Sequence, residues 1–258
     1  MLQGALALGV IVTPLMVDAD VREGETSVRI TITNEEGRTL PPEHATRLRV
    51  FVHTEDERRQ SHRDRVPVCQ PTTNDGVSTY AVTGWHVPAS GLSYRVNPEK
   101  APSDIRSSAA GAIAAAAQTW KNADGDKTVT FAGSTDVSRP RYDGKNVMLW
   151  RSLSRGIVGA AYIWYLPSTG EVLDADLVLN TRVPWAVNDP SAGDCGGVAR
   201  AYDVQAVVTH ELGHWFGLED LYDASTVDLT MHGRVTMGEL KKTSLGEGDR
   251  LGANAIAP

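Results

Sequence analysis

The chain has 258 residues, of which 41% are hydrophobic and 22% are charged, and its formal net charge is −7. This length can bury a sizeable core in one or two domains, and the composition is that of an ordinary folded protein. The acidic balance and the lack of a Lys/Arg-rich block argue against nucleic acid or an anionic membrane as a partner. No apolar run in the sequence is long enough to span a membrane.

Residues 1–84 predict an N-terminal segment that is either a signal and pro-region or a small β module. Residues 2–17 are apolar enough for the hydrophobic part of a secretory signal, but they lack a basic start and a proline interrupts them. The alternative is a pair of short strands at 9–14 and 28–34, the second with strict alternation. A further strand-like pattern covers 48–53.

From Trp85 onward the sequence shows regular strand-like and helix-like patterns, and residues 85–258 predict a larger α+β domain. An alanine-rich helix is expected from Ser103 to about Asn122, and a second helix is expected to begin near Asp203, which can cap it. Alternating or apolar runs predict five strands, at 92–97, 127–131, 146–150, 159–165 and 172–180.

The second helix carries a His-Glu-x-x-His motif at 210–214. On a helix, His210 and His214 share one face, so their imidazoles can take two corners of a zinc tetrahedron. Glu211 can then reach a water beside the metal as a general base. Because this motif also occurs by chance, the residues that follow it decide how much it means.

Gly217 and Asp220 stand where such a site needs them. A glycine lets the chain leave the helix through a left-handed turn, and the chain can then return beneath the metal with Asp220 as a third ligand. A methionine-containing turn follows at 230–233, with Met231 at its centre. Met237 is a weaker candidate for the same turn.

This combination resembles the metzincin clan of zinc metallopeptidases, and more closely its matrixin-like and snapalysin-like members. The resemblance implies zinc ligation by His210, His214 and Asp220, with Glu211 as the catalytic acid and base and Met231 beneath the metal. The aspartate departs from most of the clan, in which the third ligand is histidine.

The resemblance also implies a zincin-like α+β domain over 85–258. It is expected to have a mixed five-stranded sheet, two main helices and a C-terminal helix within 238–257, preceded by the small β-rich or pro-segment. In such folds an edge strand above the metal pairs with an extended peptide. Here Gly159, Ala160, Ala161 and Tyr162 stand at that edge, although an ordinary amphipathic strand explains them too.

Other residues compete for some of these roles. Glu219 or His232 could replace Asp220 as the third ligand, and Glu239 could do so in a thermolysin-like arrangement. Calcium, which the family often uses, is a possible second ion, although turn residues need no ion. The candidate calcium ligands are Asn122, Asp124, Asp126, Asp189 and Asp194.

The two cysteines, Cys69 and Cys195, allow three interpretations. A disulfide would tie the N-terminal segment to the larger domain, as an oxidising exterior permits. Cys69 could instead hold the open zinc position in a latent form, as in matrixin pro-segments. Both could also be free thiols.

The resulting expectation is a secreted, monomeric zinc endopeptidase that cleaves protein or peptide substrates, with zinc and possible calcium as cofactors and no nucleic-acid or membrane partner. The alternative is a zinc-stabilised, non-proteolytic binding or adhesion module outside the cell, in which residues 1–84 do the work. A purely structural zinc site has no need of Glu211, which favours the peptidase.

Overall fold

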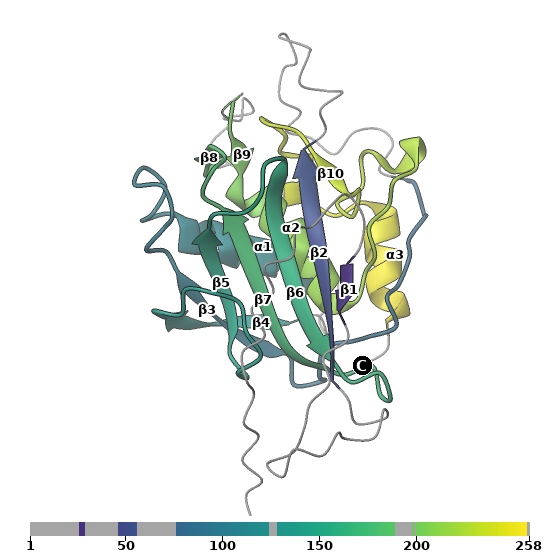
Figure 1. Cartoon of the computed structure of the whole chain (residues 1–258). Coiled ribbons are helices and arrows are strands. Elements are labelled where there is room, and N and C mark those ends of the chain that lie inside the picture. The colour runs from purple at the N-terminus through teal and green to yellow at the C-terminus, as the bar shows by residue number, and fades with distance from the viewer. Residues whose placement is uncertain are drawn as a thin grey trace, which may run out of the picture.

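The computed structural model describes residues 26–28, 46–55, 76–123, 128–188, 198 and 200–256, and these form an α+β fold (Figure 1). The strands are β1 (Thr26–Val28), β2 (Arg47–Glu55), β3 (Leu92–Asn97), β4 (Val129–Ser134), β5 (Asn146–Arg151), β6 (Ile157–Tyr165), β7 (Val172–Asn180), β8 (Trp185–Ala186), β9 (Tyr202–Asp203) and β10 (Arg234–Val235). The helices are α1 (Ala109–Ala123), α2 (Val204–Phe216) and α3 (Glu247–Ala255), with the 3-10 turns η3 (Ala224–Thr226) and η4 (Lys241–Thr243). None of these helices is both long and apolar enough to cross a membrane.

The main sheet is mixed and runs in the order β1-β2-β6-β7-β5-β3-β4, with β10 also paired to β2. Strands β4, β3, β5 and β7 pair in parallel, whereas β6 is antiparallel to both β7 and β2. The five strands expected from the sequence are β3 to β7, and all five are present. The expected total of five is too low, because β1, β2 and β10 extend the sheet.

Strand β6 is not an edge strand among the described residues, which corrects the expectation for Gly159 to Tyr162. β2 pairs with it from Arg47 to Thr54 and covers its free side. β2 comes from the predicted N-terminal segment, so at least this part of 1–84 belongs to the same sheet as the larger region. The sequence showed the strand pattern at 48–53 but carried no signal for its neighbour.

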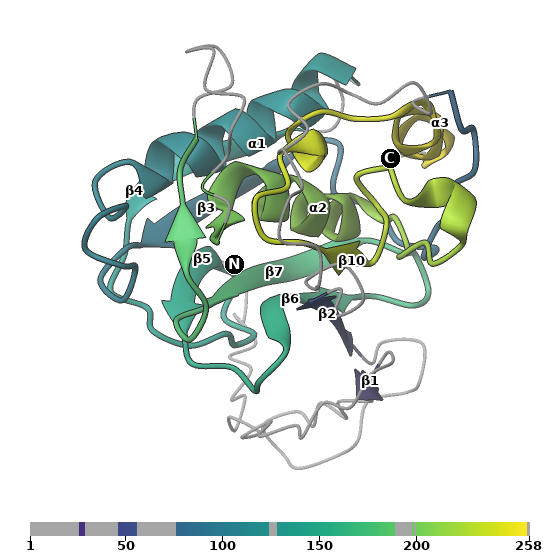
Figure 2. The same ribbon diagram turned by 90° about the horizontal axis from the view of Figure 1, so that it is seen from above.

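The helices lie together on one side of the sheet, with α2 against β6 and β7 and α1 against α2 (Figure 2). The alanines of α1 permit this close packing: Ala109, Ala112, Ala116 and Ala117 are buried. Two tryptophan side chains cross-link the layer, since Trp120 Nε1 donates to the Thr209 carbonyl and Trp85 Nε1 to the His214 carbonyl. The helix that carries the motif is therefore fixed from both flanks.

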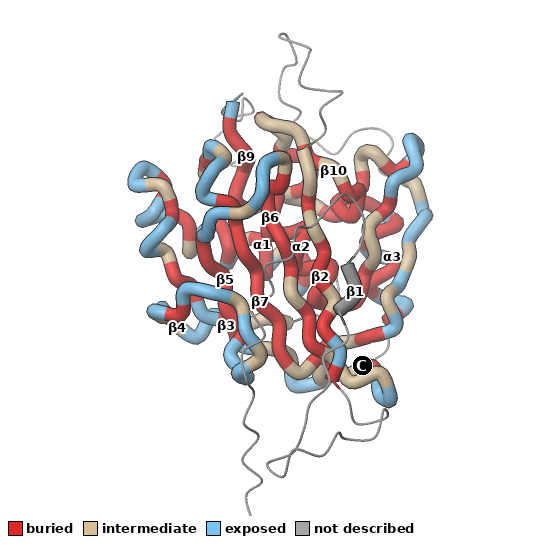
Figure 3. Tube along the Cα trace, in the orientation of Figure 1, coloured by how far each residue is buried: buried red, intermediate tan, exposed pale blue. Residues whose placement is uncertain are grey.

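Buried residues run along the central strands, and exposed residues lie mostly in the loops (Figure 3). The principal core fills the space between the sheet and the helices. A smaller apolar cluster joins β2 and β6 and contains Leu48, Val50, Ala160 and Trp164. β2 is thus packed into the fold as well as hydrogen-bonded to it.

Two helices begin later than the sequence predicts. Residues 103–108 form turns, in which Ile105 N donates to the Pro102 carbonyl, and α1 begins only at Ala109. The closing helix, expected within 238–257, begins at Glu247, after Gly238 has taken a left-handed φ of 77°. By contrast, α2 begins where expected, with Asp203 accepting from Ala206 N.

Candidate metal centre

Helix α2 ends at Gly217, as its sequence predicts. Gly217 has a φ of 114°, and its N–H donates to the carbonyls of Gly213 and His214. A Cβ at this position would also overlap the Trp85 carbonyl oxygen. Glycine is required here for backbone conformation and for space, and the turn brings residues 218–220 back beneath the helix.

The turn assembles the three predicted ligands, His210, His214 and Asp220, which we call the ligand triad. The two Nε2 atoms are 3.1 Å apart, and Asp220 Oδ1 lies 3.2 Å from that of His210 and 3.5 Å from that of His214. These three groups can offer atoms to one ion. Both rings are buried and the Asp220 side chain is 11% exposed, so the triad is largely shielded from water.

Backbone carbonyls set the tautomer of each ring. His210 Nδ1 is 2.7 Å from the Thr230 carbonyl oxygen, and His214 Nδ1 is 2.9 Å from that of Leu218. A carbonyl only accepts, so each Nδ1 carries the proton and donates it, which leaves each Nε2 with its lone pair toward the other. This is the arrangement that outer hydrogen bonds impose on metal-binding histidines.

Two lone pairs and a carboxylate so close together require a shared cation or proton. Burial, together with the charge of Lys242, lowers the pKa of His210 to about 3. Burial also lowers the pKa of His214, but the Asp220 carboxylate outweighs it and the net shift is upward. Burial opposes ionisation of Asp220, yet the two histidines hold its pKa well below the usual range. Neutral imidazoles and an ionised carboxylate are ligands that suit zinc, so the residues fit that ion.

Glu211 is completely buried, and neither of its carboxylate oxygens has a hydrogen-bond partner among the described residues. Burial raises the pKa of Glu211 to about 8. A Cβ added to Gly159 of β6 would lie 3.0 Å from Glu211 Oε1, so the glycine leaves room for this carboxylate. A carboxyl group that titrates near neutral pH can both take up and release a proton during a reaction.

Met231 packs against α2, and its predicted position beneath a metal remains a prediction. It is 2% exposed, and a Cβ on Gly213 would overlap its sulfur, so the thioether packs on the helix between the two histidines. The Met231 carbonyl accepts from Leu221 N, which ties the methionine turn to the chain just after Asp220. Met237 is half-buried and packs at the margin of the core.

Two residues that hold the methionine turn were not found in the sequence. Asp249 of α3 accepts from the backbone N–H groups of Thr230, Met231 and Gly246, at 2.8, 3.0 and 2.8 Å. Lys242, fully buried, donates to the carbonyls of Thr230 and His232. Both contacts join segments that have no fixed spacing in the sequence, and only the position of Asp249 near a helix start offered a signal.

The competing third ligands point elsewhere. Glu219 forms two 2.6 Å contacts with the Arg49 guanidinium. His232 Nδ1 lies 3.2 Å from the Thr226 hydroxyl, and Glu239 accepts from Thr236 N. Of the four candidates, Asp220 alone joins the two motif histidines in a group that could hold an ion.

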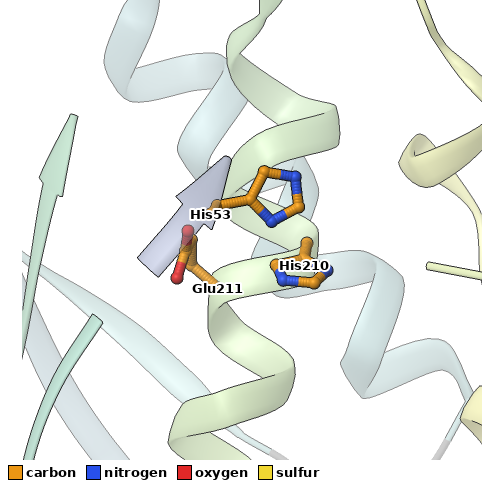
Figure 4. Close-up of side chains that lie close together, drawn as sticks. All are labelled: His53, His210 and Glu211. Atoms are coloured by element: carbon orange, nitrogen blue, oxygen red, sulfur yellow. The ribbon is translucent and has the colours of Figure 1, made fainter. Parts of the chain in front are cut away.

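His53 of β2 is an addition that sequence analysis missed. Its ring centroid is 3.9 Å from that of His210, and His53, His210 and Glu211 form a second group that could hold an ion (Figure 4). The side chain is 1% exposed, and neither ring nitrogen has a hydrogen-bond partner among the described residues. Burial, with the nearby His210 and Lys242, lowers the pKa of His53 well below its ordinary value.

Some of the remaining predicted residues lie in described parts of the structure, and the others lie outside them. Gly159, Ala160, Ala161 and Tyr162 pair with His53, Val52, Phe51 and Val50 of β2. Asn122 is exposed, and its side-chain oxygen accepts from Gln118. The other calcium candidates and both cysteines lie outside the described residues, so those predictions remain predictions: Asp124, Asp126, Asp189, Asp194, Cys69 and Cys195.

We compared the sequence with protein-family models and with curated proteins. No protein-family model matches the sequence, and no curated protein resembles it significantly.

Proposed function

We propose that the protein is a zinc-dependent endopeptidase of the metzincin type, with the ligand triad as its metal site and Glu211 as its general base and acid. One observation carries the proposal: two imidazole Nε2 atoms and a carboxylate oxygen converge beside a buried glutamate whose oxygens have no hydrogen-bond partner among the described residues. A structural zinc site has no use for such a glutamate.

The fold supports the same proposal. A mixed sheet with antiparallel β6 lies above α2, the helix ends at a left-handed glycine, and a methionine turn packs against α2. These features occur in the order that the metzincin resemblance implies. They come from segments that fold together, because Trp85, Asp249 and Lys242 bind the backbone of the helix and the turn.

Zinc in this site would supply a Lewis acid that polarises the peptide carbonyl and makes a nearby water easier to deprotonate. Glu211 takes the proton from the attacking water, and the burial that raises its pKa favours the protonated form once it holds that proton. The carbon–nitrogen bond breaks as Glu211 passes the proton to the departing amine. The Nδ1–H bonds to Thr230 and Leu218 keep both ligand rings in one orientation throughout.

Strand β6 is the proposed wall for substrate. The hydrogen-bonding side of β6 that β7 leaves open is paired with β2, and Gly159 lies against Glu211. An extended peptide that paired with β6 would pass its backbone across the site by strand addition. Glu219, close to the triad and now bound to Arg49, is placed to favour a basic side chain in such a peptide.

The test separates metal binding from chemistry. Metal content would be measured in wild type, His214→Ala and Glu211→Gln. Hydrolysis of casein and of a quenched peptide would be followed after residues 1–75, which include β2, are cleaved from the purified chain, because Ala81 and Thr83 bind the turn after α2 and are kept. We expect one zinc per chain in wild type and Glu211→Gln, little in His214→Ala, and hydrolysis in wild type alone. Stoichiometric zinc without hydrolysis of any substrate would favour the binding-module alternative.

A further inference from the structure

Strand β2 lies where an extended peptide would bind. It is antiparallel to β6 from Arg47 to Thr54 and, at its far end, parallel to β10, where Thr54 and Glu55 pair with Arg234 and Val235 (Figure 2). β10 follows the methionine turn directly. β2 therefore runs between the proposed substrate wall and the segment below the metal, and main-chain hydrogen bonds hold it there on both sides.

Alternate side chains of β2 make successive contacts with the metal site. Phe51 stacks on the ring of His214 with centroids 3.8 Å apart and planes 12° apart. His53, two residues later on the same face, packs against His210 at 3.9 Å. The strand register shifts between His53 and Thr54, which places an irregularity next to the metal position.

An anchor at the other end fixes this alignment. Both carboxylate oxygens of Glu219, the residue directly before Asp220, accept hydrogen bonds of 2.6 Å from the Arg49 guanidinium. The guanidinium also lies 4.6 Å from the centre of the Phe51 ring. A paired charge of this geometry, with side chains 12% and 23% exposed, sets the register of β2 against the site.

The ring nitrogens of His53 give the second, independent observation. Buried polar atoms are almost always hydrogen-bonded, and an unpaired one costs about 1–3 kcal/mol. Both His53 nitrogens are unpaired within the described part of the chain, although the ring is buried and packs against His210 of the ligand triad. A neutral imidazole has one lone-pair nitrogen and one N–H, and a lone pair that faces a cation needs no hydrogen bond, so coordination accounts for one of the two nitrogens.

We propose that His53 is a fourth protein ligand of the metal, and that β2 delivers it by taking the strand position of a peptide substrate. This inference rests on the proposed function. His53 and the triad share His210 in the two groups that could hold an ion. Coordination by three imidazoles and one carboxylate would fill a tetrahedral zinc site, whereas a catalytic zinc site keeps one position open. The chain therefore holds a closed form, and β2 must leave β6 before a peptide can enter.

The first test uses the full chain loaded with cobalt(II), whose visible spectrum reports its coordination. The variants are His53→Phe, which keeps a ring without a ligand, and His86→Phe, which removes a half-buried histidine that lies outside the metal site. Acetohydroxamate is the probe for an open metal position. We expect His53→Phe to shift the cobalt spectrum and to respond to acetohydroxamate, while wild type and His86→Phe do neither.

The same variants should differ in activity. Removing one metal ligand increases the fraction of molecules in which β2 has left β6. The apparent affinity for a peptide is proportional to that fraction. We expect His53→Phe to hydrolyse a quenched peptide at least about tenfold faster than the full-length wild type. Identical spectra and identical responses to acetohydroxamate in wild type and His53→Phe would overturn the proposal.

A second measurement needs no substitution. Wild type labelled with nitrogen-15 in its histidines and loaded with cadmium-113 should show scalar coupling between the metal and ring nitrogens of His53, His210 and His214. Coupling to His210 and His214 without His53 would overturn only the fourth-ligand proposal. If neither of those two couples to the metal, the ligand triad itself is wrong and the proposed peptidase function fails with it.

Discussion

The floor and the roof of the metal site are built differently. The floor is α2 and the methionine turn, where His210 and His214 each donate to a backbone carbonyl and Asp249 accepts three backbone N–H groups. The roof is β2, and both ring nitrogens of its His53 lack a hydrogen-bond partner among the described residues. The floor contacts run within α2, the methionine turn and α3, so we expect the floor to persist without β2. β2 is held by pairing with β6 and β10, as a bound strand would be.

This difference separates two kinds of sensitivity. Changes in the floor should remove chemistry, metal or stability, because its contacts hold the ligands in place. Changes in the roof should release a constraint, so they should raise activity while costing less stability. The following variants test that division, from the largest expected effect to the smallest.

Glu211→Gln should abolish chemistry and leave the floor intact. The amide has nearly the same shape but cannot accept a proton from water, and general acid–base groups contribute about 10²–10⁴-fold to rate. We expect peptide hydrolysis by protein freed of residues 1–75 to fall about a thousandfold, with zinc content unchanged. Loss of zinc in Glu211→Gln would mean that this carboxylate is part of the metal site rather than the base.

Asp249→Ala should destabilise the floor from beneath. It leaves three buried N–H groups of the methionine turn and α3 without an acceptor. We expect the free energy of unfolding to fall by about 3 kcal/mol or more, measured by urea denaturation of metal-free protein. Glu247→Ala, an exposed residue of the same helix, is the control and should cost under about 1 kcal/mol. Equal losses in both variants would remove the role given to Asp249.

Gly217→Ala should misplace the third ligand. Its φ of 114° is unfavourable for alanine, and the new Cβ meets the Trp85 carbonyl. We expect the free energy of unfolding to fall by about 2–3 kcal/mol. We also expect weaker zinc binding, measured by competition with a chromophoric chelator. Gly111→Ala, in an exposed and open position of α1, should instead stabilise by roughly 0.5–1 kcal/mol. Unchanged zinc affinity in Gly217→Ala would show that Asp220 does not depend on this turn.

Arg49→Met should loosen the roof alone. It removes the paired contact with Glu219 but keeps much of the apolar stem, and a partly exposed ion pair is worth about 1 kcal/mol. We expect a severalfold rise in peptide hydrolysis by the full chain, corresponding to that free energy, with zinc content unchanged. Arg47→Met, at an exposed position of the same strand, should have no effect. A fall in activity would place Arg49 in the substrate site instead of the closed form.

The floor could be predicted because its determinants stand close together in the sequence. The spacing of His210 and His214 places them on one helix face, and Gly217 and Asp220 follow at short, fixed distances. The structure confirms that these residues converge. Their use of zinc and their peptidase activity remain predictions, because spacing and geometry define a site but not the reaction.

The roof could not be predicted, because strand pairing between distant segments leaves no local pattern. The alternation at 48–53 indicated a strand. This pattern did not indicate that the strand pairs with β6 or that His53 is part of the site. The late starts of α1 and α3 were missed for a related reason. Turn geometry after Pro102 and the contacts of Asp249 override local helix preference, and both depend on the folded surroundings.

The cover that β2 places on β6 also bears on solubility. When β2 leaves, the nine-residue strand β6 presents a row of unpaired backbone groups, and the apolar cluster of Ala160 and Trp164 loses Leu48 and Val50. Exposed strands of this kind pair readily with other chains. If β2 leaves as proposed, the open form would be prone to self-association, and a peptide bound along β6 would protect it.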